Sequence, residues 1–251
     1  MIPSVRLYSL VCLLLVLSGF SLRADEADKK GKDKEEAKPA TVVPVSKPDA
    51  WWQARHQLIN DRAKKGDVDV LFVGDSITQG WEGEGAAKVW EKYFGEFHPM
   101  NAGIGGDRTQ HVLWRLQNGN LENIQPKLMV LMIGTNNAGA DSAEDIAAGI
   151  KEIVTYYRSA RPESKVLVLG IFPRSLNEDE LRKKVADASR LTADIADGKQ
   201  VFYLDIGGKF LQPDGTIDSG IMPDYLHLSE AGYTIWGENV APEIKKLISA
   251  P

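Results

Sequence analysis

Two segments far apart in the sequence carry side chains that could act together in nucleophilic chemistry. Ser76 follows Gly74 and Asp75 at the end of an apolar run, and a serine at a strand-to-helix turn has an exposed hydroxyl suited to attack a carbonyl carbon. Asp224 precedes His227 by three residues, so its carboxylate can hold one imidazole nitrogen while the other faces the nucleophile as a general base. Both segments also have a purely structural interpretation, with Ser76 as a helix N-cap and the Asp–His pair as surface residues before a helix.

Two further segments could stabilise negative charge on a reacting carbonyl oxygen. The glycine-rich stretch 103–106 precedes a predicted helix, and its backbone N–H groups can face an oxyanion or a phosphate. Asn136 lies in a Gly-Thr-Asn-Asn turn, where its side-chain amide can donate to the same oxygen. The glycine stretch is not a dinucleotide-binding fingerprint, because it lacks the third glycine of that motif. Tight-turn geometry alone would also explain both segments.

Apolar runs predict the strands that would position these segments. They are short, rich in Val, Ile and Leu and not alternating, as in parallel strands that are buried on both faces. The runs cover residues 68–73, 128–133, 166–172 and 201–206, with a weaker strand near 99–102. Helical patterns cover residues 51–64, 84–94, 107–117, 142–159, 178–196 and 229–249. This alternation predicts an α/β fold with a parallel sheet between helices. Because ligands bind at the carboxyl ends of such strands, we expect the four segments to meet at one rim.

The four segments together resemble the sequence blocks of the SGNH (GDSL-type) hydrolase superfamily. Within it, the chain is similar to the catalytic subunits of platelet-activating-factor acetylhydrolase from about Val70 to the last helix. The stretches that carry this similarity are residues 103–107, 109–116, 134–137 and 224–229. The resemblance implies a three-layer α/β/α fold with a flavodoxin-like, five-stranded parallel sheet. It implies no cofactor.

The resemblance also implies a role for each site residue. Ser76 would be the nucleophile, His227 the general base and then acid, and Asp224 the group that orients His227. The oxyanion would be held by the backbone N–H groups of Ser76 and Gly106 and by the side-chain amide of Asn136. No histidine has metal-ligand spacing with a partner histidine, so we expect no metal site.

These residues predict a serine esterase that hydrolyses short-chain, acetyl-type esters through an acyl-enzyme. Ile77, Thr135 and Leu226 each adjoin a catalytic position and are candidates to line a small acyl pocket. Trp81 is a candidate to border that pocket, with packing in the core as the equal alternative. The expected substrate is an acetylated glycan or a short-chain lipid ester. A dedicated exported carbohydrate O-acetylesterase, or a non-catalytic exported module that binds a glycan or a protein, are the alternatives.

The N-terminal region has the features of a secretory signal followed by a linker. Residues 1–24 hold a basic residue and then an apolar run that is short for a membrane span. We therefore expect export to the periplasm or the medium with cleavage near residue 24, and an uncleaved anchor is the alternative. Residues 25–49 are rich in charge and proline and are expected to form a disordered linker. The hydrolase domain is then expected over residues 50–251.

The composition restricts the classes of partner. The 251 residues are 43% apolar and 26% charged, with a net charge of −5, which is ordinary for a globular domain and disfavours nucleic acid as a ligand. The one cysteine, Cys12, lies in the predicted leader, so no disulfide is expected in the mature chain. No integral membrane span is expected after cleavage. Formation of a homodimer through the helix near Trp114 is left open.

Overall fold

The structure is a computed structural model that describes residues 38–249. The predicted leader and the first part of the predicted linker, residues 25–37, lie outside the described residues. Within the described part of the chain, no helix is both long enough and apolar enough to cross a bilayer.

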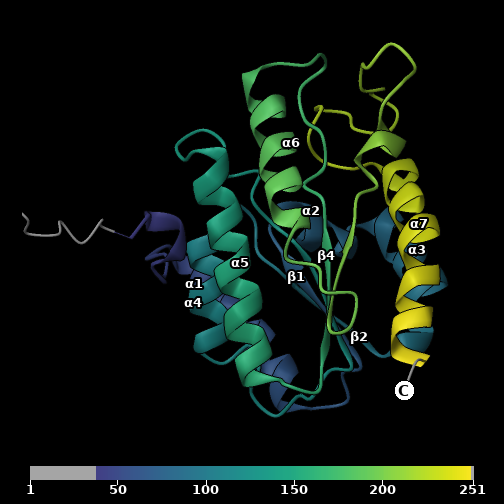
Figure 1. Ribbon diagram of the computed structural model, residues 1–251. Helices are drawn as coiled ribbons and strands as arrows, with labels where there is room; N and C mark the ends of the chain where they lie inside the picture. The colour runs from purple at the N-terminus through teal and green to yellow at the C-terminus, as the bar shows by residue number, and fades with distance from the viewer. Residues whose placement is uncertain (1–37, 250–251) are drawn as a thin grey trace, which may run out of the picture. The chain divides into compact units, whose positions relative to one another are not determined.

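Five parallel strands form one sheet at the centre of the domain (Figure 1). The strands are β1 (Val70–Gly74), β2 (Pro99–Gly103), β3 (Leu128–Met132), β4 (Lys165–Leu169) and β5 (Val201–Leu204). Their order across the sheet is β2-β1-β3-β4-β5, which is the flavodoxin-like order. Every residue of β1 and β3 is buried, because helices cover both faces and a buried strand needs no polar side. The predicted fold class is therefore confirmed.

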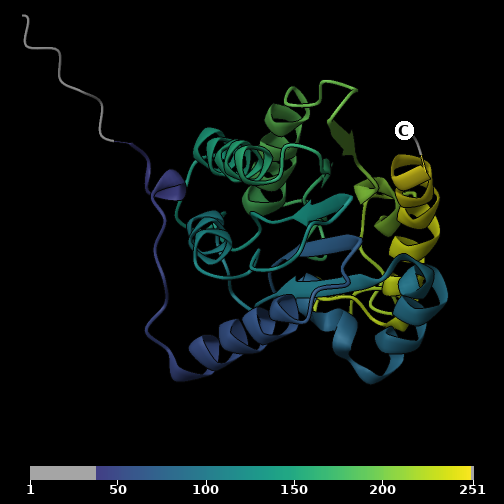
Figure 2. The ribbon, with the colours of Figure 1, turned by 90° about the horizontal axis from the view of Figure 1, so that it is seen from below.

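Helices form a layer on each face of the sheet, as the view from below in Figure 2 shows. The α-helices are α1 (Ala50–Lys64), α2 (Ser76–Gln79), α3 (Glu84–Phe94), α4 (Thr109–Gln117), α5 (Ala143–Ala160), α6 (Glu180–Ala193) and α7 (Glu230–Ser249). Short 3-10 helices are η1 (Ala40–Val42), η2 (Gly80–Glu82), η3 (Gly95–Phe97) and η4 (Gly207–Phe210).

Side chains of β1, β3 and β4 alternate between two separate cores. Leu71 and Val73 of β1 pack with α1, α4, α5 and α6 on one face. Val70 and Phe72 of the same strand pack with α3 and α7 on the other face. Burial on both faces fixes the register of the sheet, since a shift of one residue would exchange the two sets of side chains. The carboxyl ends of the strands are thereby held at one edge.

The structure differs from the predicted linker over residues 40–47, which we call the N-terminal strap. The strap runs along the domain past α4 and α5 before α1 begins (Figure 2). Thr41 is fully buried, its carbonyl accepts a hydrogen bond from Thr109 Oγ1 at 3.0 Å, and Val45 N–H donates to the Gln110 carbonyl at 3.3 Å. The order of the strap comes from backbone groups that pair with the start of α4. Hydrogen bonds of this kind cannot be recognised from composition, so the charge and proline content of the strap predicts a linker instead.

Candidate active site

Ser76 is the first residue of α2 and directly follows the end of β1 through a tight turn. The turn requires glycine at position 74, because a Cβ there would lie 2.4 Å from the Met132 carbonyl oxygen and 2.1 Å from Thr78 Oγ1. Asp75 caps the helix, with Oδ1 accepting a hydrogen bond from Ile77 N–H at 3.0 Å. The Ser76 side chain is thus held at the carboxyl edge of the sheet, half-buried.

His227 and Asp224 lie on the loop before α7, and His227, 151 residues further along the chain, reaches Ser76. Oδ1 of Asp224 accepts from the backbone N–H of His227 at 2.7 Å, which fixes the turn between the two residues. Oδ2 lies 2.7 Å from His227 Nδ1, and His227 Nε2 lies 2.9 Å from Ser76 Oγ. In the tautomer with the proton on Nδ1, the imidazole donates to the carboxylate and Nε2 accepts from the serine hydroxyl.

The environment of Asp224 favours its charged form. Partial burial raises the pKa of the carboxyl. Hydrogen bonds from the His227 side chain and backbone N–H lower it by more than burial raises it, so the pKa lies below its ordinary value of 3.8. The side chains of His227 and Asp224 remain 46% and 56% exposed. A charged carboxylate is therefore in contact with an imidazole that solvent and a substrate can reach.

Asp75, next to Ser76, is electrostatically unusual. Its side chain is fully buried, and burial raises the pKa of the carboxyl from 3.8 to about 7, with the negative charge of Asp107 adding to the rise and the Ile77 N–H opposing it. Oδ2 of Asp75 has no hydrogen-bond partner within residues 38–249. This carboxyl thus changes its charge near neutral pH, beside the serine.

The glycine-rich loop after β2 passes close to Ser76. A Cβ built on Gly105 would lie 3.8 Å from Ser76 Cβ. Gly105 N–H donates to Gln79 Oε1 at 2.7 Å, whereas the next N–H, that of Gly106, has no acceptor in the described part of the chain. Gly106 has a φ of +68°, in the left-handed region that glycine adopts without strain. The loop therefore offers one unpaired donor near the serine.

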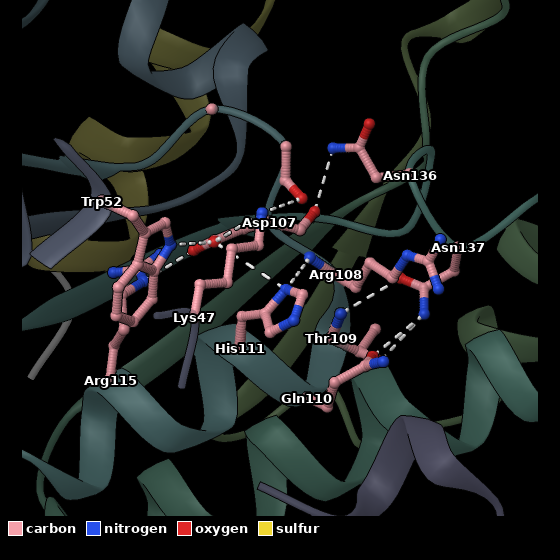
Figure 3. Close-up of polar contacts among 12 residues, drawn as sticks. Lys47, Trp52, Asp107, Arg108, Thr109, Gln110, His111, Arg115, Asn136 and Asn137 are labelled. Carbon is pink, nitrogen blue, oxygen red and sulfur yellow. Dashed lines mark hydrogen bonds and ion pairs between the residues drawn. The ribbon is translucent and has the colours of Figure 1, made fainter. Parts of the chain in front are cut away.

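Asn136 lies on the loop after β3, beside the same glycine-rich loop (Figure 3). Its Nδ2 donates to the Asp107 carbonyl at 2.9 Å, and the amide keeps a second N–H. The three residues expected to hold an oxyanion, Ser76, Gly106 and Asn136, thus lie on the loops that follow three adjacent strands.

The four residues expected to contact substrate differ in how far they are buried. Ile77 and Thr135 are buried, and Leu226 is half-buried. Trp81 is 1% exposed, with its ring centroid 4.4 Å from that of Tyr233 and 5.1 Å from that of Trp236. The position of Trp81 agrees with the alternative interpretation, packing in the core, because η2 turns the indole between α3 and α7.

Sequence reasoning did not predict the places of Arg174 and Arg115 near the site. Arg174, after β4, donates from Nη1 to the Thr135 carbonyl at 3.0 Å and to Thr135 Oγ1 at 3.2 Å. Arg115 of α4 is fully buried and donates from Nε to Asp107 Oδ2 at 2.7 Å. The position of Arg174 after a predicted strand was the one signal available for it. Arg115 gave none, since a charged residue on a helix is usually exposed.

A flavodoxin-like sheet with a serine, a histidine and an aspartate in contact at its carboxyl edge has the architecture of a hydrolase. The sequence profile of the GDSL-like lipase/acylhydrolase family matches residues 72–235. The chain belongs to this family, and it is an enzyme of the esterase and acylhydrolase class. The resemblance noted in the sequence is thereby confirmed.

Curated relatives agree with this assignment, and solved structures agree with the fold. Platelet-activating factor acetylhydrolase IB subunit alpha1 from Homo sapiens is 40% identical over 81% of this chain and 87% of its own length. Subunit alpha2 from Rattus norvegicus is 39% identical over the same shares. The aryl esterase of M. smegmatis has a TM-score of 0.58 at 20% identity, covering 71% of this chain and 98% of its own. A carbohydrate acetylesterase family member from Sinorhizobium meliloti has a TM-score of 0.57 at 17% identity, covering 72% and 99%.

Proposed function

We propose that the protein hydrolyses short-chain, acetyl-type esters by two-step acyl transfer to Ser76. In the first step, Ser76 Oγ attacks the ester carbonyl carbon while His227 Nε2 takes the hydroxyl proton, then returns it to the departing alcohol oxygen as the carbon–oxygen ester bond breaks. In the second step, His227 takes a proton from water, and the resulting attack releases the acid from Ser76. Asp224 holds the imidazole and stabilises its positive charge.

The observation that carries the proposal is the pair of contacts from His227, at 2.9 Å to Ser76 Oγ and 2.7 Å to Asp224 Oδ2. A module that only binds a ligand has no physical need for such a proton path. The N–H groups of Ser76 and Gly106 and the second amide N–H of Asn136 would stabilise the tetrahedral oxyanion. Loss of one such donor typically slows turnover by about 10²–10³-fold.

A short acyl group is favoured by the side chains beside the proposed triad. Ile77 and Thr135 are buried and so offer fixed walls, and Arg174 ties down Thr135. The relatives at about 40% identity carry the name acetylhydrolase, which agrees with a small acyl group. We expect turnover of p-nitrophenyl esters to fall as the acyl chain lengthens from acetate to octanoate.

The test is turnover of p-nitrophenyl acetate by the wild type and by Ser76→Ala. We expect the variant to lose nearly all turnover with an unchanged circular dichroism spectrum, and a fluorophosphonate to label the wild type at Ser76. Turnover that persists in folded Ser76→Ala would refute the mechanism. Absence of labelling in the folded wild type would favour the non-catalytic binding module.

We further propose that the enzyme is exported, with residues 1–24 as a cleaved leader and a linker between this leader and the N-terminal strap. The basic residue and short apolar run of the leader support this. The intact mass of the protein recovered outside the cytoplasm tests it, since cleavage predicts a chain that begins near residue 25. A full-length mass in the membrane fraction would instead indicate an uncleaved anchor.

A further inference from the structure

The N-terminal strap ends on the loop that carries the proposed oxyanion donor. Lys47 Nζ donates to the Gly106 carbonyl at 2.6 Å and lies 3.9 Å from Asp107 Oδ1, as Figure 3 shows. The Lys47 side chain is only 17% exposed. The strap itself is held by Gln53 Nε2, which donates to the Lys47 carbonyl at 2.6 Å. The ammonium group is therefore fixed in place beside the loop.

The residue after Gly106 is anchored on its other side by a buried polar cluster. Asp107 is fully buried, with Oδ1 accepting from Trp52 Nε1 at 2.6 Å and Oδ2 accepting from Arg115 Nε at 2.7 Å. Its carbonyl also accepts from Asn136 Nδ2 at 2.9 Å. One residue thus joins the glycine-rich loop to the loop of Asn136, and Figure 3 shows these contacts converging on it.

Hydrogen bonds hold the peptide groups on both sides of the one that carries the Gly106 N–H. The preceding peptide is held by the bond from Gly105 N–H to Gln79. The following peptide is held by Lys47 at its carbonyl oxygen and by a 3.2 Å bond from Asp107 N–H to the Ile104 carbonyl. The peptide that carries the Gly106 N–H lies between them. Because glycine has wide backbone freedom, fixing both neighbours is what aims this donor.

We propose that Lys47 is a positioning residue of the oxyanion hole, so that the N-terminal strap is a working part of the active site. The inference rests on the proposed function. Lys47 holds the loop in the orientation that receives the oxyanion, and its positive charge favours negative charge nearby. The oxyanion carries its negative charge in the transition state and not in the bound ester. Loss of Lys47 should therefore lower kcat and leave KM nearly unchanged.

The first experiment compares Lys47→Met and Lys47→Arg with the wild type, using p-nitrophenyl acetate. We expect Lys47→Met to lower kcat about tenfold, a fraction of the effect of deleting an oxyanion donor, with KM within about twofold. Lys47→Arg keeps the charge and the donor and should restore most of kcat. Lys38→Met is the matched control, because Lys38 is an exposed lysine just before the strap, and it should match the wild type.

The outcomes separate this inference from the proposed function. If Ser76→Ala abolishes turnover but Lys47→Met has wild-type kcat, the inference is wrong and the proposed function stands. A fall in kcat shared equally by Lys38→Met, or a change confined to KM, would also overturn it. If Ser76→Ala retains turnover, the proposed function is wrong, and the inference about Lys47, which rests on it, is wrong as well.

A second experiment removes the dependence on how well a variant folds. Lys47→Cys is measured before and after alkylation with 2-bromoethylamine, which converts the cysteine into a close analogue of lysine on the same folded chain. Alkylation with iodoacetamide supplies a neutral group as the control, and the treated wild type accounts for alkylation of other side chains. We expect kcat to recover only with the aminoethyl group. Complete aminoethylation without recovery would overturn the inference.

Discussion

At the residue scale, the proposed mechanism depends on the carboxylate of Asp224 holding one imidazole tautomer. Asparagine at this position keeps the shape but can donate an amide N–H to His227 Nδ1. The imidazole then carries its proton on Nε2 and cannot accept the proton of Ser76. We expect Asp224→Asn to lower kcat by about a hundredfold or more, with an unchanged thermal unfolding midpoint because the side chain is more than half exposed. Steady-state kinetics measure this, and a change of less than about twofold would argue against the role.

A second residue-scale prediction concerns the buried carboxyl of Asp75. Because burial raises its pKa from 3.8 to about 7, the folded protein keeps a proton that the unfolded chain releases between these pH values. The free energy of unfolding should therefore fall as the pH rises through this window, by up to about 1.4 kcal/mol per pH unit.

The matched variant is Asp75→Asn, which retains the oxygen that accepts from Ile77 N–H but cannot titrate. Urea unfolding at several pH values between 4 and 7 should show the variant gaining stability relative to the wild type as the pH rises. Parallel pH profiles for the two proteins would show that Asp75 does not titrate in this window.

At the element scale, the aromatic cluster between α3 and α7 packs in one of the two cores beside the sheet. Trp81 is 1% exposed, so we expect Trp81→Ala to lower the free energy of unfolding by about 3–5 kcal/mol, with KM changed little in the protein that remains folded. Trp51→Ala, at a 56% exposed position in α1, should change stability by less than about 0.5 kcal/mol. A selective rise in KM for Trp81→Ala with unchanged stability would restore Trp81 to the substrate site.

The elements also show why some predictions from the sequence succeeded and others did not. The continuous apolar runs at β1 and β3 predicted buried parallel strands, since both of their faces are covered. For Trp81 the sequence left two interpretations open, because a tryptophan after the nucleophile can face either side, and η2 is what turns the indole toward the core. The prediction of a disordered linker was wrong for the N-terminal strap. The strap is held by backbone hydrogen bonds to α4, and such bonds cannot be recognised from composition.

At the scale of the whole molecule, the candidate site could be predicted because parallel strands bring their carboxyl ends to one edge. Ser76 and His227 are 151 residues apart, yet their side chains are in contact. The cluster around Asp107 could not be predicted, since its partners come from α1 and α4 and depend on how the helices pack. Sequence patterns thus identified the candidate side chains that the structure brings together, while packing determined which residues support them.

The central claim is that a covalent acyl group forms on Ser76, and trapping that intermediate tests it most directly. The wild type is mixed with p-nitrophenyl acetate, quenched in acid during turnover, digested and examined by mass spectrometry. We predict one acetyl group on the peptide that contains Ser76, and none on that peptide in Ser76→Ala. Full turnover with no acylated protein, or with the acetyl group on another residue, would contradict the account.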